Sequence, residues 1–418
     1  MAFVRLFLFG LLGISVGLVK AQQPYFQQEV NYSIRVQLDE NKHRLRGHIR
    51  VQYRNNGSEP LTKMYWHLWP NAYSSRRSAY ARQQLQQGNT AFYFATPDQQ
   101  GAIDSLAFEV NGQPISWQII PDTPDVALLM LPQALLPGQT IAIATPFRVR
   151  IPHNFSRMGR IGRSYQLTQW FPKPAVYDRE GWHPMPYLDA GEFYSEFGDF
   201  EVHLDVPASY IVAATGVLQN EAEKQWLQTK ARQTLSALTD SHESFPQQTG
   251  PAGRKTLTFH AAKVHDFAWF ADPEFQILHD TVSITGGQAV QTWAFFKPPE
   301  QKRWQNILDY TRRALQFYSE KVGPYLYPQM SVVSCPEGAP GGMEYPMITA
   351  LGYMGSDRAL DQTAAHEIGH NWWYGILASN ERDHAWMDEG INSYYEKRYM
   401  RQYYPLQPDD LPQSRRTD

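Results

Sequence analysis

Two histidines and a glutamate in the second half of the chain have types and spacing that fit metal-assisted hydrolysis. His366 and His370 are four residues apart in His-Glu-Ile-Gly-His, so on a helix both side chains share one face, with Cβ atoms about 5–6 Å apart. Two imidazoles placed in this way can bind one metal ion at about 2.0–2.1 Å. Glu367 borders the same face without competing for the ion, which is where a base for the attacking water is needed. The pattern therefore predicts a hydrolytic metal site on a helix.

A third donor, Glu389, follows the second histidine after 18 intervening residues. Two antiparallel helices with a short connection would bring its carboxylate across to the ion. Two histidines and one carboxylate leave the fourth position of a tetrahedral zinc ion for water, which is typical of catalytic sites. We predict one Zn²⁺ per chain, bound by His366, His370 and Glu389, with Glu367 as the catalytic base. The alternative is a set of polar residues on a solvated helix face.

These motifs carry a family resemblance. His366-Glu-x-x-His370 with Glu389 inside Trp386-Met-Asp-Glu-Gly390 resembles the aminopeptidase N-type gluzincin family of zinc metallopeptidases. The resemblance covers residues 300–400 closely and the preceding β region loosely. It implies a thermolysin-like catalytic domain and a peptide substrate with a free N-terminus.

The segment Gly341-Gly-Met-Glu-Tyr345 resembles the family's Gly-x-Met-Glu-Asn signature, whose glutamate binds the free amine of the substrate. The resemblance thus assigns substrate binding to Gly341, Gly342, Met343 and Glu344, and also to Gln169 in Tyr165-Gln-Leu-Thr-Gln169. A carboxylate facing an ammonium also has a physical reason, because a blocked amine leaves that carboxylate unpaired. The alternative for Glu344 is an ordinary loop carboxylate.

The chain departs from the family pattern at three places. Tyr345 stands where the signature has asparagine, and Phe171 stands where an acid or amide usually follows Gln169 by two residues. The family's oxyanion-binding tyrosine lies several tens of residues after the last zinc glutamate, and we expect it beyond Asp418. We therefore expect a catalytic domain that lacks its C-terminal part, and weak catalysis by the 418-residue form.

The surrounding pattern predicts the elements that position these residues. Alternation of apolar and polar residues between Tyr32 and about Gly216 indicates antiparallel sheet. After about residue 272 the period becomes helical. We expect helices at 221–235, 300–322, from 357–361 to 375, and 388–400, and a strand at 329–333. The predicted organisation is a signal peptide at 1–21, an antiparallel β domain at 22–275 and an incomplete thermolysin-like α/β zinc domain at 276–418.

Composition narrows the class of protein. With 42% apolar residues and 14% aromatic residues in 418, the chain is globular rather than disordered. The net charge of −3 and the lack of a basic run argue against a nucleic-acid partner. Cys335 is the sole cysteine of the sequence, so neither an internal disulfide nor a cysteine zinc site can form.

The N-terminus resembles an export signal. Arg5 precedes an uncharged apolar run from Leu6 to Val19, and small residues at positions 19 and 21 fit cleavage before Gln22. We expect an exported protein, periplasmic or secreted, without stable membrane insertion. An uncleaved signal anchor is the alternative.

Together these observations predict an exported zinc metallopeptidase, specifically an aminopeptidase. Two alternatives remain at this point: an endopeptidase or small-molecule hydrolase on the same scaffold, and a catalytically weak or inactive zinc-bearing binding protein or fragment.

Overall fold

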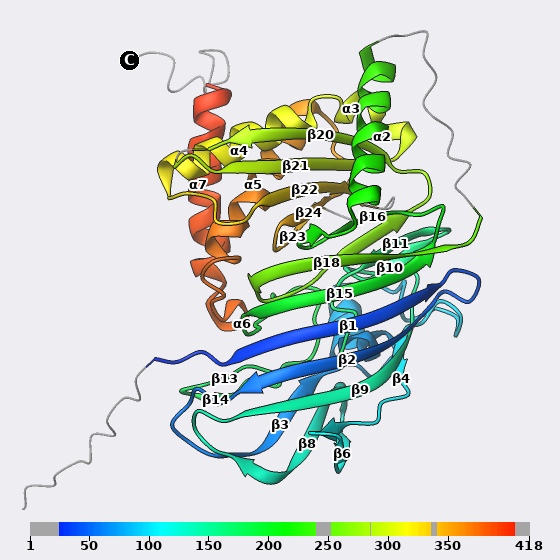
Figure 1. The fold of residues 1–418 in the computed structure, drawn as a ribbon, viewed down its shortest axis with the longest axis vertical. Coiled ribbons are helices and arrows are strands. Elements are labelled where there is room, and N and C mark those ends of the chain that lie inside the picture. Colours follow the sequence, from blue (N-terminus) through cyan, green and yellow to red (C-terminus); the bar gives the residue numbers. More distant parts are fainter. Residues whose placement is uncertain (1–24, 240–251, 285, 336–340, 406–418) are drawn as a thin grey trace, which may run out of the picture.

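A computed structural model describes residues 25–239, 252–284, 286–335 and 341–405. Over these residues a β-rich half is followed by a second sheet with helices packed against it (Figure 1). The predicted signal peptide and residues 240–251 and 406–418 lie outside the described residues. Among the described residues, no helix combines the length and apolar content that a membrane crossing requires.

The N-terminal half is built around one long sheet in which buried and exposed residues alternate. In β1 (Glu29–Asp39) every second side chain is buried, from Val30 to Leu38, as the sequence pattern predicts. In order across the sheet the strands are β17 (Val217–Leu218), β18 (Arg254–Val264), β15 (Gly198–Pro207), β1, β2 (Arg44–Arg54), β9 (Thr140–Arg150), β5 (Glu109–Val110) and β6 (Gln113–Pro114), and β4 (Ala102–Asp104) also pairs with β9.

Smaller sheets and turns pack against this long sheet. One contains β10 (Gly159–Ile161), β11 (Ser164–Leu167), β19 (Trp269–Asp272) and β16 (Ile211–Ala214); another contains β12 (Lys173–Pro174), β3 (Leu61–His67), β8 (Thr123–Leu135) and β7 (Trp117–Ile120); β13 (Tyr177–Asp178) pairs with β14 (Gly181–Trp182). The short helices of this half are η1 (Trp69–Tyr73) and α1 (Ala79–Gln86).

One pairing in this half differs from the antiparallel expectation. β1 and β15 run parallel, with Tyr32 opposite Phe200, and their rings stack with centroids 4.2 Å apart. Alternation of apolar residues reports which face of a strand is buried but not its direction, so the sequence pattern could not distinguish this parallel pair from its antiparallel neighbours.

The second half contains a mixed sheet with an edge strand that carries the Gly-Gly-Met-Glu motif. Its strands are β20 (Gln276–Ser283), β21 (Ala289–Phe296), β22 (Gln329–Ser334), β24 (Ile348–Leu351) and β23 (Gly342–Tyr345), in that order. β21, β22 and β24 run parallel, whereas β23 is antiparallel to β24. One edge of β23 therefore has no strand partner among the described residues.

Helices α2 (Glu221–Thr239), α4 (Ile307–Lys321) and α5 (Asp357–Trp373) pack on this sheet, and the other helices of this half lie beside them (Figure 1). These others are η2 (Pro298–Glu300), α3 (Gln301–Trp304), α6 (Glu381–His384), η3 (Ala385–Met387) and α7 (Glu389–Tyr403). The expected single helix 300–322 is interrupted, which corrects that prediction: Asn306 adopts φ −101° and ψ 5° between α3 and α4. Asparagine has low helix propensity because its side chain competes for backbone hydrogen bonds.

The helix with the two histidines, α5, lies between the sheet and two other helices. Ser356 caps its start, since its side chain accepts a hydrogen bond from the Ala359 amide. α5 contacts β23 and β24 on one side and α4 and α7 on the other. Burial on several sides explains why small residues, such as Ala364 and Ala365, occupy positions close to the histidines.

Candidate active site

The three predicted zinc donors converge. His366 Nε2 lies 3.1 Å from His370 Nε2 and 3.3 Å from Glu389 Oε2, and His370 Nε2 lies 3.9 Å from the same oxygen. Donors bound tetrahedrally at about 2.0–2.1 Å lie roughly 3.3 Å apart. The donor set and its spacing therefore fit a zinc ion, with room for a fourth ligand.

Contacts between α5 and α7 explain how Glu389 reaches the histidines. His370 is near Glu389 at the start of α7, His366 O accepts from Asn392 Nδ2 at 2.7 Å, and Asp361 accepts from the Tyr399 hydroxyl at 2.6 Å. Because positions decrease along α5 as they increase along α7, the two helices are antiparallel, as the sequence spacing predicts.

Two acids that the sequence reasoning missed orient the histidines. His370 Nδ1 is 2.6 Å from Asp388 Oδ1, and His366 Nδ1 is 3.0 Å from Glu396 Oε2. A carboxylate on Nδ1 fixes the imidazole so that Nε2 faces the metal. The sequence position of both acids could have indicated this role. Asp388 directly precedes the predicted ligand Glu389, and Glu396 lies seven residues after Glu389, on the same helix face.

Glu367 is buried beside the donors, under the edge strand β23. Burial raises the pKa of its carboxyl to about 7, and the neighbouring histidines oppose that shift. A Cβ on Gly342 would lie 2.2 Å from Glu367 Oε1, so only glycine lets the carboxylate occupy this position. Gly342 was predicted to bind substrate, and its observed contact adds a positioning role toward Glu367.

Gly342→Ala is expected to lower turnover about 100-fold, because a misplacement of about 1 Å of a catalytic group has an effect of that size. Zinc content should not change, since Gly342 touches no zinc donor in the contacts above. Gly355→Ala is the matched control, because a Cβ there meets nothing within 4 Å. Metal analysis and initial rates test this, and equal rates for both variants would contradict it.

Glu344 also faces this site. Side chains alternate along a strand, so Gly342 and Glu344 face α5 together, and a Glu344 oxygen lies within 4.8 Å of donor atoms of His370 and Asp388. Met343 and Tyr345 point to the opposite face, and both are buried. Gly341 has φ +64° and lies at the start of the edge strand. The structure thus brings Glu344 to the donors, but not the Met343 side chain.

Gln169 has other partners. Its Nε2 is 3.5 Å from Asp266 Oδ2, and its Oε1 is 3.4 Å from the Tyr345 hydroxyl. Its φ of +47° is uncommon for a non-glycine residue and is held by these surroundings. No hydrogen bond joins it to Glu344 within the described ranges. Phe171 is buried in an aromatic cluster with Tyr32 and Phe200.

The tyrosines near the end of α7 are engaged elsewhere. The hydroxyls of Tyr399 and Tyr404 both donate to Asp361, at 2.6 and 2.7 Å. Tyr394 is exposed, whereas Tyr395 packs partly against the core beside Trp373. Cys335 is buried, as predicted, and burial raises the pKa of its thiol, which keeps the nucleophilic thiolate scarce.

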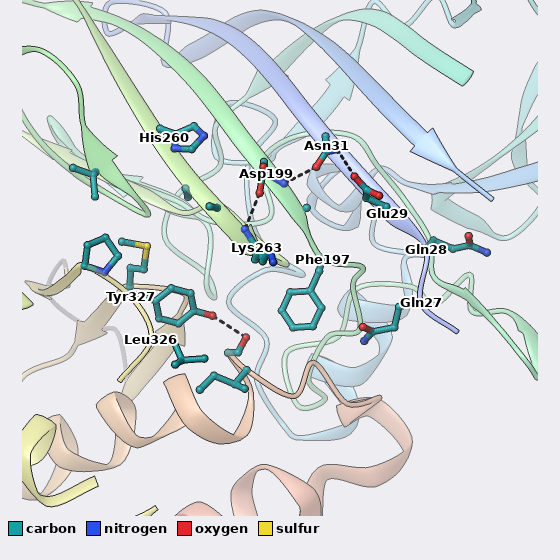
Figure 2. Close-up of a pocket in the computed structure, with 18 of the residues that line it drawn as sticks. Gln27, Gln28, Glu29, Asn31, Phe197, Asp199, His260, Lys263, Leu326 and Tyr327 are labelled. Atoms are coloured by element: carbon teal, nitrogen blue, oxygen red, sulfur yellow. Dashed lines mark hydrogen bonds between the residues drawn. The ribbon is translucent and has the colours of Figure 1, made fainter. Parts of the chain in front are cut away.

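A cavity of about 870 Å³ lies elsewhere, between the long sheet and the end of α5 (Figure 2). Lys263 and Asp199 line it on one side and Leu326 and Tyr327 on the other, and the Tyr327 hydroxyl donates to Gly375 O at 2.9 Å. None of the zinc donors lines this cavity. The predicted zinc donors and Glu367 therefore lie outside this cavity.

Solved structures share this fold. The chain resembles the crystal structure of an M1 zinc metallopeptidase from Deinococcus radiodurans, with a TM-score of 0.56 and 18% identity over 91% of this chain and 71% of that chain. A structure of a mutant of that protein, bound to a Tyr-Ser-Ala substrate, gives a TM-score of 0.57 with 16% identity and 92% and 73% coverage. The predicted fold class, a β-rich domain followed by an α/β domain, is confirmed.

Sequence comparisons match a part of the chain. Residues 307–415 match the Peptidase family M1 domain. Leukotriene A-4 hydrolase from Xenopus laevis is 32% identical over 91 residues, 21% of this chain and 15% of that protein. Leucine aminopeptidase 2 from Emericella nidulans is 31% identical over 104 residues, 24% of this chain and 17% of that protein. The matches thus span about a sixth of these relatives.

The fold and donor set define the class as a zinc-metallopeptidase scaffold. Residues 307–415 match the Peptidase family M1 domain, and this match together with the shared fold confirms the predicted resemblance to the aminopeptidase N-type gluzincins. The cofactor of this class is Zn²⁺, which fits the donors His366, His370 and Glu389.

Proposed function

We propose that the chain acts as a zinc aminopeptidase that removes N-terminal residues from peptides. One observation carries this proposal. The donor triangle, formed by the three predicted zinc donors, lies together with the buried carboxylate of Glu367 and with Glu344 of the edge strand. Zinc held by the three donors would polarise the scissile carbonyl and lower the pKa of water. Proton transfer and substrate binding would be performed by residues of the chain.

Glu367 is placed to take the proton of the attacking water and to return it to the leaving amine. Its Oε2 has no hydrogen-bond partner among the described residues, so that oxygen is free to accept a proton. A base of this kind accelerates proton transfer by about 10²–10⁴.

The edge strand β23 provides the substrate platform. The strand has one free edge among the described residues, and an extended peptide can add to such an edge through main-chain hydrogen bonds. Gly341, Gly342 and Met343 would contribute backbone groups there, and Glu344 would bind the N-terminal ammonium. Gln169 would not touch the substrate; it would support β23 indirectly, through its contact with the Tyr345 hydroxyl.

Glu344→Ala is expected to weaken hydrolysis of free-amine peptides by about 1.5–3 kcal/mol in kcat/KM, the contribution of a hydrogen bond to a charged group. N-acetylated peptides should be poor substrates of the parent protein. The test compares kcat/KM for free and acetylated forms of one peptide. Equal cleavage would favour an endopeptidase, and no cleavage of either by zinc-loaded protein would favour a binding protein.

We also propose export through a signal peptide at 1–21. The apolar run from Leu6 to Val19 with small residues before Gln22 supports this. N-terminal sequencing of the exported protein should begin at Gln22. A mature protein that still begins at Met1 would favour the signal anchor.

A further inference from the structure

A second cluster of carboxylates lies beside the donor triangle. Glu192, Glu344 and Glu381 each offer an oxygen, and these oxygens lie within 4.8 Å of one another. The three residues come from distant parts of the chain: the segment before β15, the edge strand β23, and α6. Glu344 belongs to the site described above, whereas the other two acids have no role in it so far.

Glu381 is the most informative member of the cluster. Its side chain is only 1% exposed, and neither carboxylate oxygen has a hydrogen-bond partner among the described residues. Glu344 is 4% exposed, and its Oε1 also has no hydrogen-bond partner among the described residues. Buried polar groups are nearly always satisfied in native proteins, so such atoms point to a missing ligand. Burial also raises the pKa of Glu381, and Asp388 and Glu344 raise it further.

Glu192 is held in place from two sides. Arg157 forms a bidentate ion pair with its carboxylate, and Arg382 of α6 donates to the main-chain oxygens of Glu192 and Pro186. Arg157 compensates one of the three carboxylates. Neither Glu344 nor Glu381 forms an ion pair with any described residue.

The cluster is compact enough for its three acids to bind a single ammonium group. An ammonium has three N–H donors in tetrahedral directions. Charge-assisted bonds of about 2.8 Å along these directions place three acceptors roughly 4.6 Å apart. The three carboxylate oxygens lie within 4.8 Å of one another, which is close enough for one such group to reach all three.

We propose that Glu381 and Glu192, together with Glu344, form one subsite for the N-terminal ammonium of the substrate. This inference rests on the aminopeptidase function proposed above. Each N–H of the ammonium donates to a different glutamate. The three hydrogen bonds therefore fix the position of the substrate N-terminus relative to the zinc donors. Arg157 and Arg382 are positioning residues, because they hold Glu192 and its segment against α6.

The residues beside the predicted Gln169 do not offer an equivalent acceptor. Gln169 Oε1 is close to the Tyr345 hydroxyl, and Phe171 has no polar group. Tyr345 projects from the opposite face of β23 from Glu344. The acceptors that complete the subsite therefore come from the segment before β15 and from α6.

Binding of two probes tests the proposal. The dipeptide Leu-Gly and its N-acetyl form are titrated calorimetrically into zinc-loaded full-length protein that carries Glu367→Gln, which prevents turnover during the measurement. Glu381→Gln and Glu192→Gln are each expected to weaken Leu-Gly binding at least tenfold and to leave the N-acetyl form unchanged. Glu320→Gln is the control, because Glu320 lies on the surface of α4 beside Lys321.

Thermal unfolding of the same proteins separates this role from a structural one. Glu381→Gln should unfold at the same or a higher temperature, because it replaces a buried carboxyl that has no partner among the described residues. A lower unfolding temperature together with equal losses for both probes would overturn the proposal.

Other outcomes are also decisive. If Leu-Gly and its N-acetyl form bind equally to the protein before Glu381 or Glu192 is changed, the proposed function fails. If they differ and Glu381→Gln and Glu192→Gln keep that difference, only the subsite fails. A loss confined to peptides that begin with lysine or arginine would reassign the cluster to a side-chain pocket. A second metal ion per chain that disappears in Glu381→Gln would make it a cation site.

Discussion

Replacing Glu367 by glutamine is expected to lower kcat at least about 100-fold while zinc content stays near one per chain. The amide has the same shape but cannot accept the proton of the attacking water, and loss of a general base has an effect of this scale. Glu367 is not one of the three converging donors, so the metal should remain. Initial rates with a free-amine peptide, together with elemental analysis of the same sample, measure both quantities.

The structure offers a control and a clear contradiction for this prediction. Glu320→Gln makes the same chemical change on the surface of α4 and should keep parental kcat. Near-normal turnover by Glu367→Gln with full zinc would show that another group activates the water. Comparison with Gly342→Ala is also informative, because that variant moves the same carboxylate and leaves its chemistry intact.

The convergence of the three predicted donors could be anticipated from the sequence because local geometry links them. His366, Glu367 and His370 lie on one helix, so their relative positions follow from helical spacing alone. Glu389 begins the next long helix, and the antiparallel arrangement of α5 and α7 brings it to the histidines. Only one contact between separate elements, that of α7 with α5, had to be inferred.

The acids around that site were harder to predict because tertiary contacts place them. Glu192 and Glu381 are 189 positions apart in sequence, and only the packing of the segment before β15 against α6 joins them. No spacing or periodicity encodes such a contact. The same reason applies to the parallel pairing of β1 with β15 and to the contact of Gln169 with Tyr345.

His366→Ala is expected to remove most of the bound zinc and, with it, the turnover. Two donors would remain from the set of three, and a catalytic zinc site usually needs three protein ligands. His366 suits this test better than His370, because loss of His370 would leave the fully buried Asp388 without its partner and would strongly destabilise the fold. His366 is partly exposed, and its partner Glu396 lies near the surface.

Stability supplies a readout that does not depend on turnover. Zinc binds the folded state, so free zinc at 100 times its Kd should raise the unfolding free energy of the parent by about 2.7 kcal/mol. That increase should vanish in His366→Ala and in Glu389→Gln, and it should persist in His203→Ala, where a histidine outside the site is changed.

Asp388→Asn should give an intermediate result, because the three donors remain and only the orientation of His370 is weakened. A loss of about 10–100-fold in zinc affinity is the usual effect of such an outer partner. Full zinc content in the double variant His366→Ala with Glu389→Gln would show that the ion is held by other residues, and the acids around Glu344 would then be the first to test.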